Sequence, residues 1–102
     1  SGNIHTAVQD ARRAVALLEP MARAHPRDPL ILEELYRDYQ DLAGMLGGNF
    51  NSANLGEWAE AVAANRNELA TARQLSALDP TNQRYQSLEL VAQITLGDEL
   101  RL

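Results

Sequence analysis

The sequence predicts an all-α fold in which four antiparallel helices form two stacked helix pairs. Apolar side chains recur every three or four residues through four segments, the spacing that lines one face of a helix. Breaks rich in Pro, Gly and Asn separate these segments, and the whole chain resembles itself at a shift of 54 residues. We therefore expect a single domain with helices over about residues 4–25, 29–46, 55–78 and 82–97.

The first expected helix has one apolar face and one irregularity. Pro20 lies near its end, where the missing amide hydrogen and the ring should kink the helix or end it locally. The apolar face is formed by Ile4, Val8, Ala11, Val15, Leu18 and Ala22.

The second expected helix begins at a strong start signal. Asp28 offers a side-chain oxygen to the free amides of the first turn, and Pro29 fits the first helical position. The apolar face consists of Leu32, Leu35, Tyr39, Leu42 and Leu46, and the polar face of Glu33, Glu34, Arg37, Asp38 and Asp41. One side of this helix should therefore face the core and the other side water.

Two further helices follow a break rich in Gly and Asn. Asp79-Pro80 ends the third helix, and either Thr81 or Asn82 can cap the fourth, which should pause at Gly97. The third helix should run through Trp58, Val62, Asn65, Leu69, Ala72 and Leu75, and the fourth through Tyr85, Leu88, Val91, Ala92 and Leu96.

The composition excludes several classes of function. There is no Cys, so no thiolate metal site, disulfide or cysteine nucleophile exists. The net charge is −5, and nine scattered Arg residues without any Lys argue against nucleic-acid binding. No apolar run approaches the roughly 20 residues of a membrane span. The start at Ser1-Gly2 suggests a piece of a longer protein, whose compartment, cytoplasmic or periplasmic, stays open.

The sequence predicts no catalytic, cofactor or metal site. His5 and His25 are far apart, and neither has a second metal-binding side chain at helical spacing on a clear inward face. Acidic neighbours such as Glu33 and Glu34 diverge on a helix, so they do not form a general acid and base pair. We therefore expect no catalytic residues, no cofactor and no metal, in a protein that is not an enzyme.

The self-similarity matches positions in the two halves of the chain without any insertion. It aligns Ala7-Val8 with Ala61-Val62, Arg12 with Arg66, Pro26 with Pro80, Asp28 with Asn82, and Leu42 with Leu96. A fixed period of this kind is typical of stacked helix pairs, in which no pair can bury its apolar face alone.

The matched positions also resemble a known family. Leu42, Leu46-Gly47, the run 49–56, the stretch 61–66 and Leu78-Asp79-Pro80 followed by Asn82 are similar to a long-helix variant of the tetratricopeptide repeat. Such regions follow bacterial eukaryotic-type serine/threonine kinases and occur in related bacterial regulators. The resemblance implies helices in the order second-first-second-first of successive pairs. It also implies a noncatalytic protein-interaction or scaffold module of a bacterial signalling or regulatory protein.

The stretch "GGNFNSANLGEW" at residues 47–58 has two structural interpretations. Its Gly and Asn residues suit either a ligand-binding loop or the long turn that joins the two helices of one pair. The resemblance favours the long turn.

Three hypotheses for function follow from these patterns. The first is that a concave surface lined by the first helix of each pair holds a protein or peptide, as the resemblance implies, through Tyr36, Arg37, Gln40, Arg84, Ser87 and Gln93. The second is a homodimer formed through an exposed apolar face, left without its partner helix, around Ile4, Val8 and Val15. The third, with least support, is a small-molecule sensor with a polar cavity around Asn65 and Arg66.

Overall fold

The computed structural model describes residues 3–47 and 55–100, and the side chains of residues 5–47 and 57–97. Its four helices are α1 (Asn3–Ala24), α2 (Pro29–Gly47), α3 (Leu55–Leu78) and α4 (Gln83–Leu100). No strand occurs in the described residues, so the all-α prediction is confirmed and the four helices lie where periodicity places them. The prediction that the fourth helix pauses at Gly97 is wrong, because α4 continues to Leu100.

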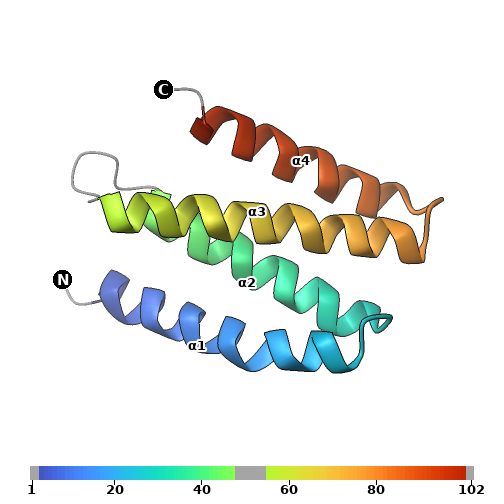
Figure 1. The fold of residues 1–102 in the computed structure, drawn as a ribbon, viewed down its shortest axis with the longest axis horizontal. Helices are drawn as coiled ribbons and strands as arrows, with labels where there is room; N and C mark the ends of the chain where they lie inside the picture. The colour runs from blue at the N-terminus through green and yellow to red at the C-terminus, as the bar shows by residue number, and fades with distance from the viewer. Residues whose placement is uncertain (1–2, 48–54, 101–102) are drawn as a thin grey trace.

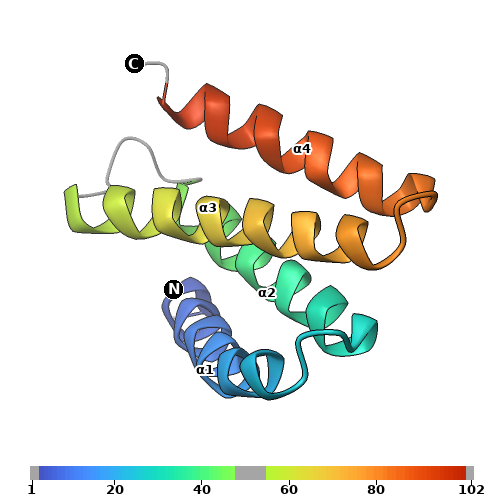
Figure 2. The ribbon, with the colours of Figure 1, turned by 45° about the vertical axis from the view of Figure 1, so that its right-hand side comes forward.

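Each helix packs against the next one along the chain, with α2 and α3 in the middle and α1 and α4 at the edges (Figure 1). The two short connections lie at one end of the molecule, and the start of α1 and the end of α4 lie at the other. Figure 2 shows α1 foreshortened while α3 and α4 lie across the view, so the helices rotate from one layer to the next. The result is a thin arrangement with extents of 40 × 29 × 18 Å.

The two short connections have the same hydrogen bonds, 54 residues apart. In the first, the bonds run from His25 N to Met21 O (2.9 Å), from Asp28 N to His25 O (3.1 Å) and from Leu32 N to Asp28 O (3.2 Å). In the second, they run from Asp79 N to Leu75 O (3.2 Å), from Asn82 N to Asp79 O (3.0 Å) and from Gln86 N to Asn82 O (3.2 Å). The sequence repeat is therefore also a structural repeat in these turns.

The predicted helix caps are present at both turns. Asp28 Oδ1 accepts a hydrogen bond from Leu30 N at 3.0 Å, and Asn82 Oδ1 accepts one from Tyr85 N at 3.2 Å. Of the two cap candidates for α4, Asn82 takes this role, while Thr81 bonds the Asp79 carboxylate instead. Each cap satisfies an amide that has no partner within its helix.

Pro20 does not end α1, so this alternative of the sequence prediction is wrong, while a kink at Pro20 stays a prediction. The helix continues through it to Ala24. Pro20 and Ala16, one turn earlier, are both exposed. The carbonyl that loses its intrahelical partner can therefore be hydrated, and the ring projects from the surface of the helix and not into the core.

The core lies on both sides of α2. Leu35, Tyr39, Leu42 and Leu46 share one buried cluster with side chains of α1 and α3, and Leu32 forms a second one with Leu75 and Tyr85. The Ala side chains of α3 in the first cluster, Ala61 and Ala64, let the backbones of α2 and α3 approach closely. Burying each Leu contributes about 1.5–3 kcal/mol to stability.

Val8 and Val15 are part of this core and do not form an exposed face. Each is only 9% exposed, and both pack in the cluster that α1 shares with α2 and α3. The expectation that this face is left without a partner is therefore wrong, because α2 and α3 together cover it. Ile4, the third residue of the expected face, lies outside the described side chains, and most of the stretch 47–58 lies outside the described residues.

Candidate interaction site between α2, α3 and α4

The six residues expected to line a groove lie in separate places. Arg37, Gln40, Arg84, Ser87 and Gln93 are exposed, but Tyr36 is only 4% exposed. Its position at the groove edge is therefore a wrong prediction. Tyr36 lies between helices, where its hydroxyl donates a hydrogen bond to the carbonyl of Leu88 in α4 at 3.3 Å.

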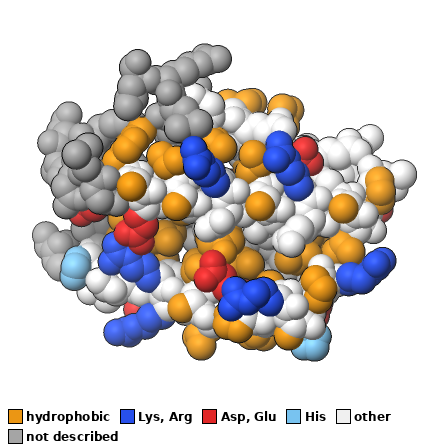
Figure 3. Space-filling view, in the orientation of Figure 1, with side chains coloured by type: hydrophobic (Ala, Val, Ile, Leu, Met, Phe, Trp, Pro, Cys, Tyr) orange, Lys and Arg blue, Asp and Glu red, His pale blue; other side chains and the backbone are white. Residues whose placement is uncertain are grey.

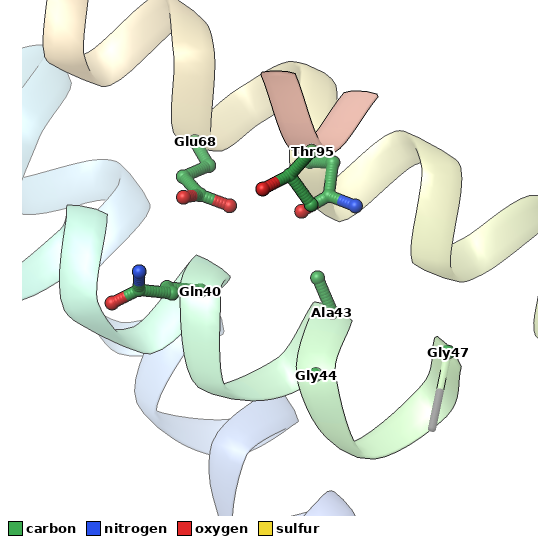
Figure 4. Close-up of a pocket in the computed structure, with 7 residues that line it drawn as sticks. Gln40, Ala43, Gly44, Gly47, Glu68 and Thr95 are labelled. Carbon is green, nitrogen blue, oxygen red and sulfur yellow. The ribbon is translucent and has the colours of Figure 1, made fainter. Parts of the chain in front are cut away.

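A hollow of about 290 Å³ lies where α2, α3 and α4 meet (Figure 4). One wall comes from the second half of α2, and Glu68 of α3 and Thr95 of α4 lie opposite it. The lining residues are Gln40, Ala43, Gly44, Gly47, Asn65, Glu68 and Thr95. Of the expected groove residues, only Gln40 borders this hollow.

The hollow is open because of small residues and diverging helices. A Cβ atom placed on Gly44 would meet no atom within 4 Å, so the wall formed by α2 is set back at this point. α4 diverges from α3 with distance from the turn at residues 79–82, as Figures 1 and 2 both show. Space therefore remains between α2 and α4 near Thr95.

The wall formed by α3 carries buried polar side chains. Asn65 and Glu68 are 1% and 2% exposed, and Thr71, one turn further along, is also buried. The Thr71 hydroxyl donates to the carbonyl of Asn67 at 2.8 Å. Burial of a carboxylate costs free energy unless hydrogen bonds compensate it, so these groups must be satisfied within the fold.

Tyr36 and Glu68 form a buried polar pair across the α2–α3 interface. Burial first, and then the charge and the hydrogen bond of Glu68, hold the pKa of the Tyr36 hydroxyl far above its usual range. The hydroxyl therefore stays protonated. Its single proton is donated to the Leu88 carbonyl, and the hydroxyl also lies against the Glu68 carboxylate, which the hollow approaches from another side.

A second set of polar side chains joins α2 to α4, close to the first turn of each helix. Glu33 accepts hydrogen bonds from Arg84 and from the Tyr85 hydroxyl, the latter at 3.1 Å. The Arg84 guanidinium lies over the ring of Tyr85, 5.4 Å from its centre. The hydrogen bond from Arg84, opposed by burial, holds the pKa of the Glu33 carboxyl below its usual range.

The other expected groove residues have different surroundings. Arg37 pairs with Glu34 of its own helix at 3.1 Å, and both side chains are at least half exposed. Gln93 borders a different, shallow groove between α3 and α4, together with Ser76, Pro80, Gln86, Glu89 and Leu90. The six residues therefore do not form one continuous surface.

Within the described part of the chain, no group of three or more His, Cys, Asp or Glu side chains is placed to hold a metal ion. No helix there combines the length and the apolar character needed to cross a membrane. Comparison with protein-family models, with curated proteins and with solved structures finds no match for this chain.

Sequence reasoning missed most of the hollow. Glu68 falls seven residues after Ala61 and three after Asn65, so the helical spacing that identifies the inner face of α3 also includes it. Because charged side chains are rarely buried, Glu68 would be expected on the exposed side of α3 despite this spacing. Gly44 and Thr95 carry no comparable pattern, because their role depends on how far α2 lies from α4.

Proposed function

We propose that this protein is a noncatalytic protein-interaction module built as a tetratricopeptide-like helix array from a bacterial signalling or regulatory protein. The hollow between α2, α3 and α4 carries the proposal, because it combines buried hydrogen-bonding side chains with a gap at Gly44. It also lies between the two helices that the resemblance assigns to the concave, partner-binding side. The partner would be an extended peptide or a protein segment.

The lining of the hollow defines the chemistry of the partner. Glu68 can only accept hydrogen bonds when ionised, and Gln40 and Thr95 can both accept and donate. The chain as a whole carries a net charge of −5. A partner segment that places one cationic or amide side chain in the hollow satisfies both features, and 290 Å³ suffices for one such side chain.

Peptide selection followed by a matched pair of variants tests this proposal. Peptides selected on the protein from a random displayed library are expected to be rich in Arg, Lys or Asn and to bind with a measurable Kd. Gly44→Leu fills the hollow and should weaken binding at least about tenfold. Ala63→Leu adds similar volume on an exposed position of α3 and should leave binding unchanged. Peptides that bind the Gly44→Leu variant equally well would exclude the hollow as their site.

One observation also keeps a small-molecule site as a second candidate function. Asn65 borders the hollow, as the sensor hypothesis requires, but Arg66 is exposed and is not part of the lining. The volume of about 290 Å³ lies just below the range of about 300–1,000 Å³ for ligand sites. A polar metabolite that raises the Tm of the wild type but not of Gly44→Leu would favour this function.

A further inference from the structure

Most of the large apolar side chains that the described chain exposes lie at its two edges. On α1 and the start of α2, Leu17, Met21 and Leu30 are 71%, 47% and 76% exposed, and on α4 Leu90 and Ile94 are each 57% exposed. We call these two groups the head face and the tail face. Figure 3 shows hydrophobic side chains reaching the surface along both edges, over α1 and over α4.

The head face matches the side of α3 that α2 covers. Residues 54 positions apart, here called counterparts, occupy the same places in the two turns. The counterparts of Leu17 and Met21 are Thr71 and Leu75, and both of these are buried. Leu75 packs in one cluster with Leu32 of α2. The uncovered side of α1 therefore corresponds to the side that α3 packs against α2.

The tail face matches the side of α2 that α3 covers. The counterpart of Leu90 is Tyr36, which is buried, lies against Glu68 of α3 and donates its hydroxyl proton to Leu88 of α4. The counterpart of Ile94 is Gln40, which is exposed and borders the hollow between α2, α3 and α4, so Ile94 lies at the margin of this side. The head face on α1 therefore corresponds to the α3 side of the α2–α3 interface, and the tail face on α4 to the α2 side. Neither face is covered by another helix of the described chain.

Two surface grooves have the same relationship. The groove beside α1 and α2 is bordered by Pro26 and Tyr39 and has a third wall from α3, which includes Thr71. The groove beside α3 and α4 has the counterparts Pro80 and Gln93 in the matching places, and no third helix of the described chain borders it. The wall that is missing here corresponds in the repeat to α1.

We propose that copies of this chain associate head to tail, with α1 of one copy on α4 of the next in the place that α3 takes on α2. The repeat then puts Leu90 beside Ala14 of the second copy, because Ala14 is the counterpart of Glu68. An apolar contact thus replaces the buried polar pair of the α2–α3 interface. The same packing covers Leu17, which is 71% exposed in the single chain, with α4 of the neighbouring copy. This surface is separate from the hollow to which we assign peptide binding.

Charge also favours this arrangement over the alternatives. Arg13 is the counterpart of Asn67, which shares its groove with Leu35. The counterpart of Leu35 is Glu89, which pairs with Arg73 of its own chain at 3.9 Å, so Arg13 of one copy borders the same groove as this Glu89 in the next copy. Opposite charges at this contact favour the packing of α1 on α4. Pairing α1 with α1 of a second copy would instead bring two positively charged Arg13 side chains together.

Asp10 limits the strength of the association. It is exposed on α1, and its counterpart is Ala64, which is buried in the α2–α3 core. Head-to-tail packing brings this charge toward an apolar contact, which costs free energy. The interface is also heterologous, so each added copy leaves one head face and one tail face free. Weak, open-ended assembly that grows with protein concentration is the expected behaviour.

Light scattering and sedimentation of single variants and of their mixture test the proposal. The weight-average mass of the wild type should rise with concentration. Leu17→Glu blocks the head face and Leu90→Glu the tail face, so each variant alone should be monomeric. An equimolar mixture should form a 1:1 heterodimer, because each variant keeps the face that the other lacks. Asp10→Ala should strengthen the association of the wild type.

Val91→Glu is the matched control for these variants. Val91 is also an exposed apolar residue of α4, but its counterpart Arg37 is exposed and charged, so assembly should be unchanged. Circular dichroism confirms that each variant is folded. A wild-type mass that stays monomeric at every concentration overturns the proposal. It is also overturned by a dimer that persists in either Leu17→Glu or Leu90→Glu, because that result indicates pairing of identical faces.

Discussion

Arg12 of α1 and Glu60 of α3 are joined by two hydrogen bonds, from Nε to Oε2 at 2.8 Å and from Nη2 to Oε1 at 2.6 Å. α1 and α3 are not consecutive in the chain, so this bidentate pair joins two helices that both pack against α2. The hydrogen bond raises the pKa of the Arg12 guanidinium and lowers that of the Glu60 carboxyl, which shows that both charged forms are favoured.

Breaking this pair should lower stability by a modest amount. Both side chains are about one third exposed, which screens the interaction, so we expect a coupling energy of about 0.5–1 kcal/mol. A double-mutant cycle with Arg12→Ala and Glu60→Ala in urea denaturation measures it. The Arg37–Glu34 pair is the control, since its greater exposure predicts a coupling close to zero. Equal coupling in the two pairs would contradict the role given to Arg12.

Acid should weaken the contact between α2 and α4 through Glu33. A carboxyl whose pKa is lowered by folding stabilises the fold above its unfolded pKa, near 4.5, and loses this contribution as pH falls through the folded value. The free energy of unfolding should therefore decline below about pH 4.5. Glu33→Gln should lower stability at pH 7 and flatten the decline, as measured by urea denaturation between pH 3 and 7. An unchanged slope in this variant argues against the ionic contact with Arg84.

Asp38→Asn should raise stability at neutral pH. Burial first, and then the charges of Glu34 and Asp41, raise the pKa of the Asp38 carboxyl. A carboxyl with a raised folded pKa disfavours the folded state when it is ionised, so the penalty is present at pH 7 and disappears below the unfolded value, near 3.8. Thermal unfolding should show a higher Tm for the variant at pH 7 and no difference at pH 3. A lower Tm at pH 7 would mean that Asp38 accepts a hydrogen bond that asparagine cannot replace.

Gly44→Ala should stabilise the protein by about 0.5–1 kcal/mol. Gly44 lies within α2, no described glycine has a positive φ, and a Cβ atom at this position meets nothing within 4 Å. Gly97→Ala should have a smaller effect, because this residue lies close to the end of α4. Urea denaturation of both variants gives the comparison. Destabilisation by Gly44→Ala would show that the hollow is closed in solution.

Tyr36→Phe should cost about 1–3 kcal/mol, because it removes a buried hydroxyl that donates to the Leu88 carbonyl and lies against the Glu68 carboxylate. Tyr39→Phe is the matched control. Its hydroxyl donates to Glu19, whose side chain is more exposed and can exchange this bond for water. Chemical denaturation of the two variants should therefore show the larger loss at Tyr36. Combining Glu68→Gln with Tyr36→Phe should recover only the part of the loss that is due to Glu68, because the Leu88 carbonyl still lacks its donor.

The sequence was informative where one helix face decides the structure. All five core positions assigned to α2, from Leu32 to Leu46, are buried, because a helix covered on two sides has a strongly biased composition. The caps at Asp28 and Asn82 were also predictable, since they depend on a few neighbouring residues. Pro20 was not, because its effect depends on whether the freed carbonyl faces water.

The candidate site was less predictable, because it depends on distances between helices that are not adjacent in the chain. Tyr36 and Gln40 are one turn apart on α2, yet one is buried and the other borders the hollow. Periodicity gives the side of a helix on which a residue lies, but not which neighbour covers that side. Val8 and Val15 show the same limit, since their face was identified correctly and its covering helices were not.

The succession of contacts has a consequence for how the molecule folds and opens. In the described residues, close backbone contacts between helices join only neighbours in the chain: α1 with α2, α2 with α3, and α3 with α4. Such short-range topology favours rapid folding, because little loop entropy is lost before contacts form. It also lets structure be lost stepwise from the ends. α1 and α4 can separate first while α2 and α3 stay together, so the molecule behaves as a short chain of coupled units and not as one indivisible core.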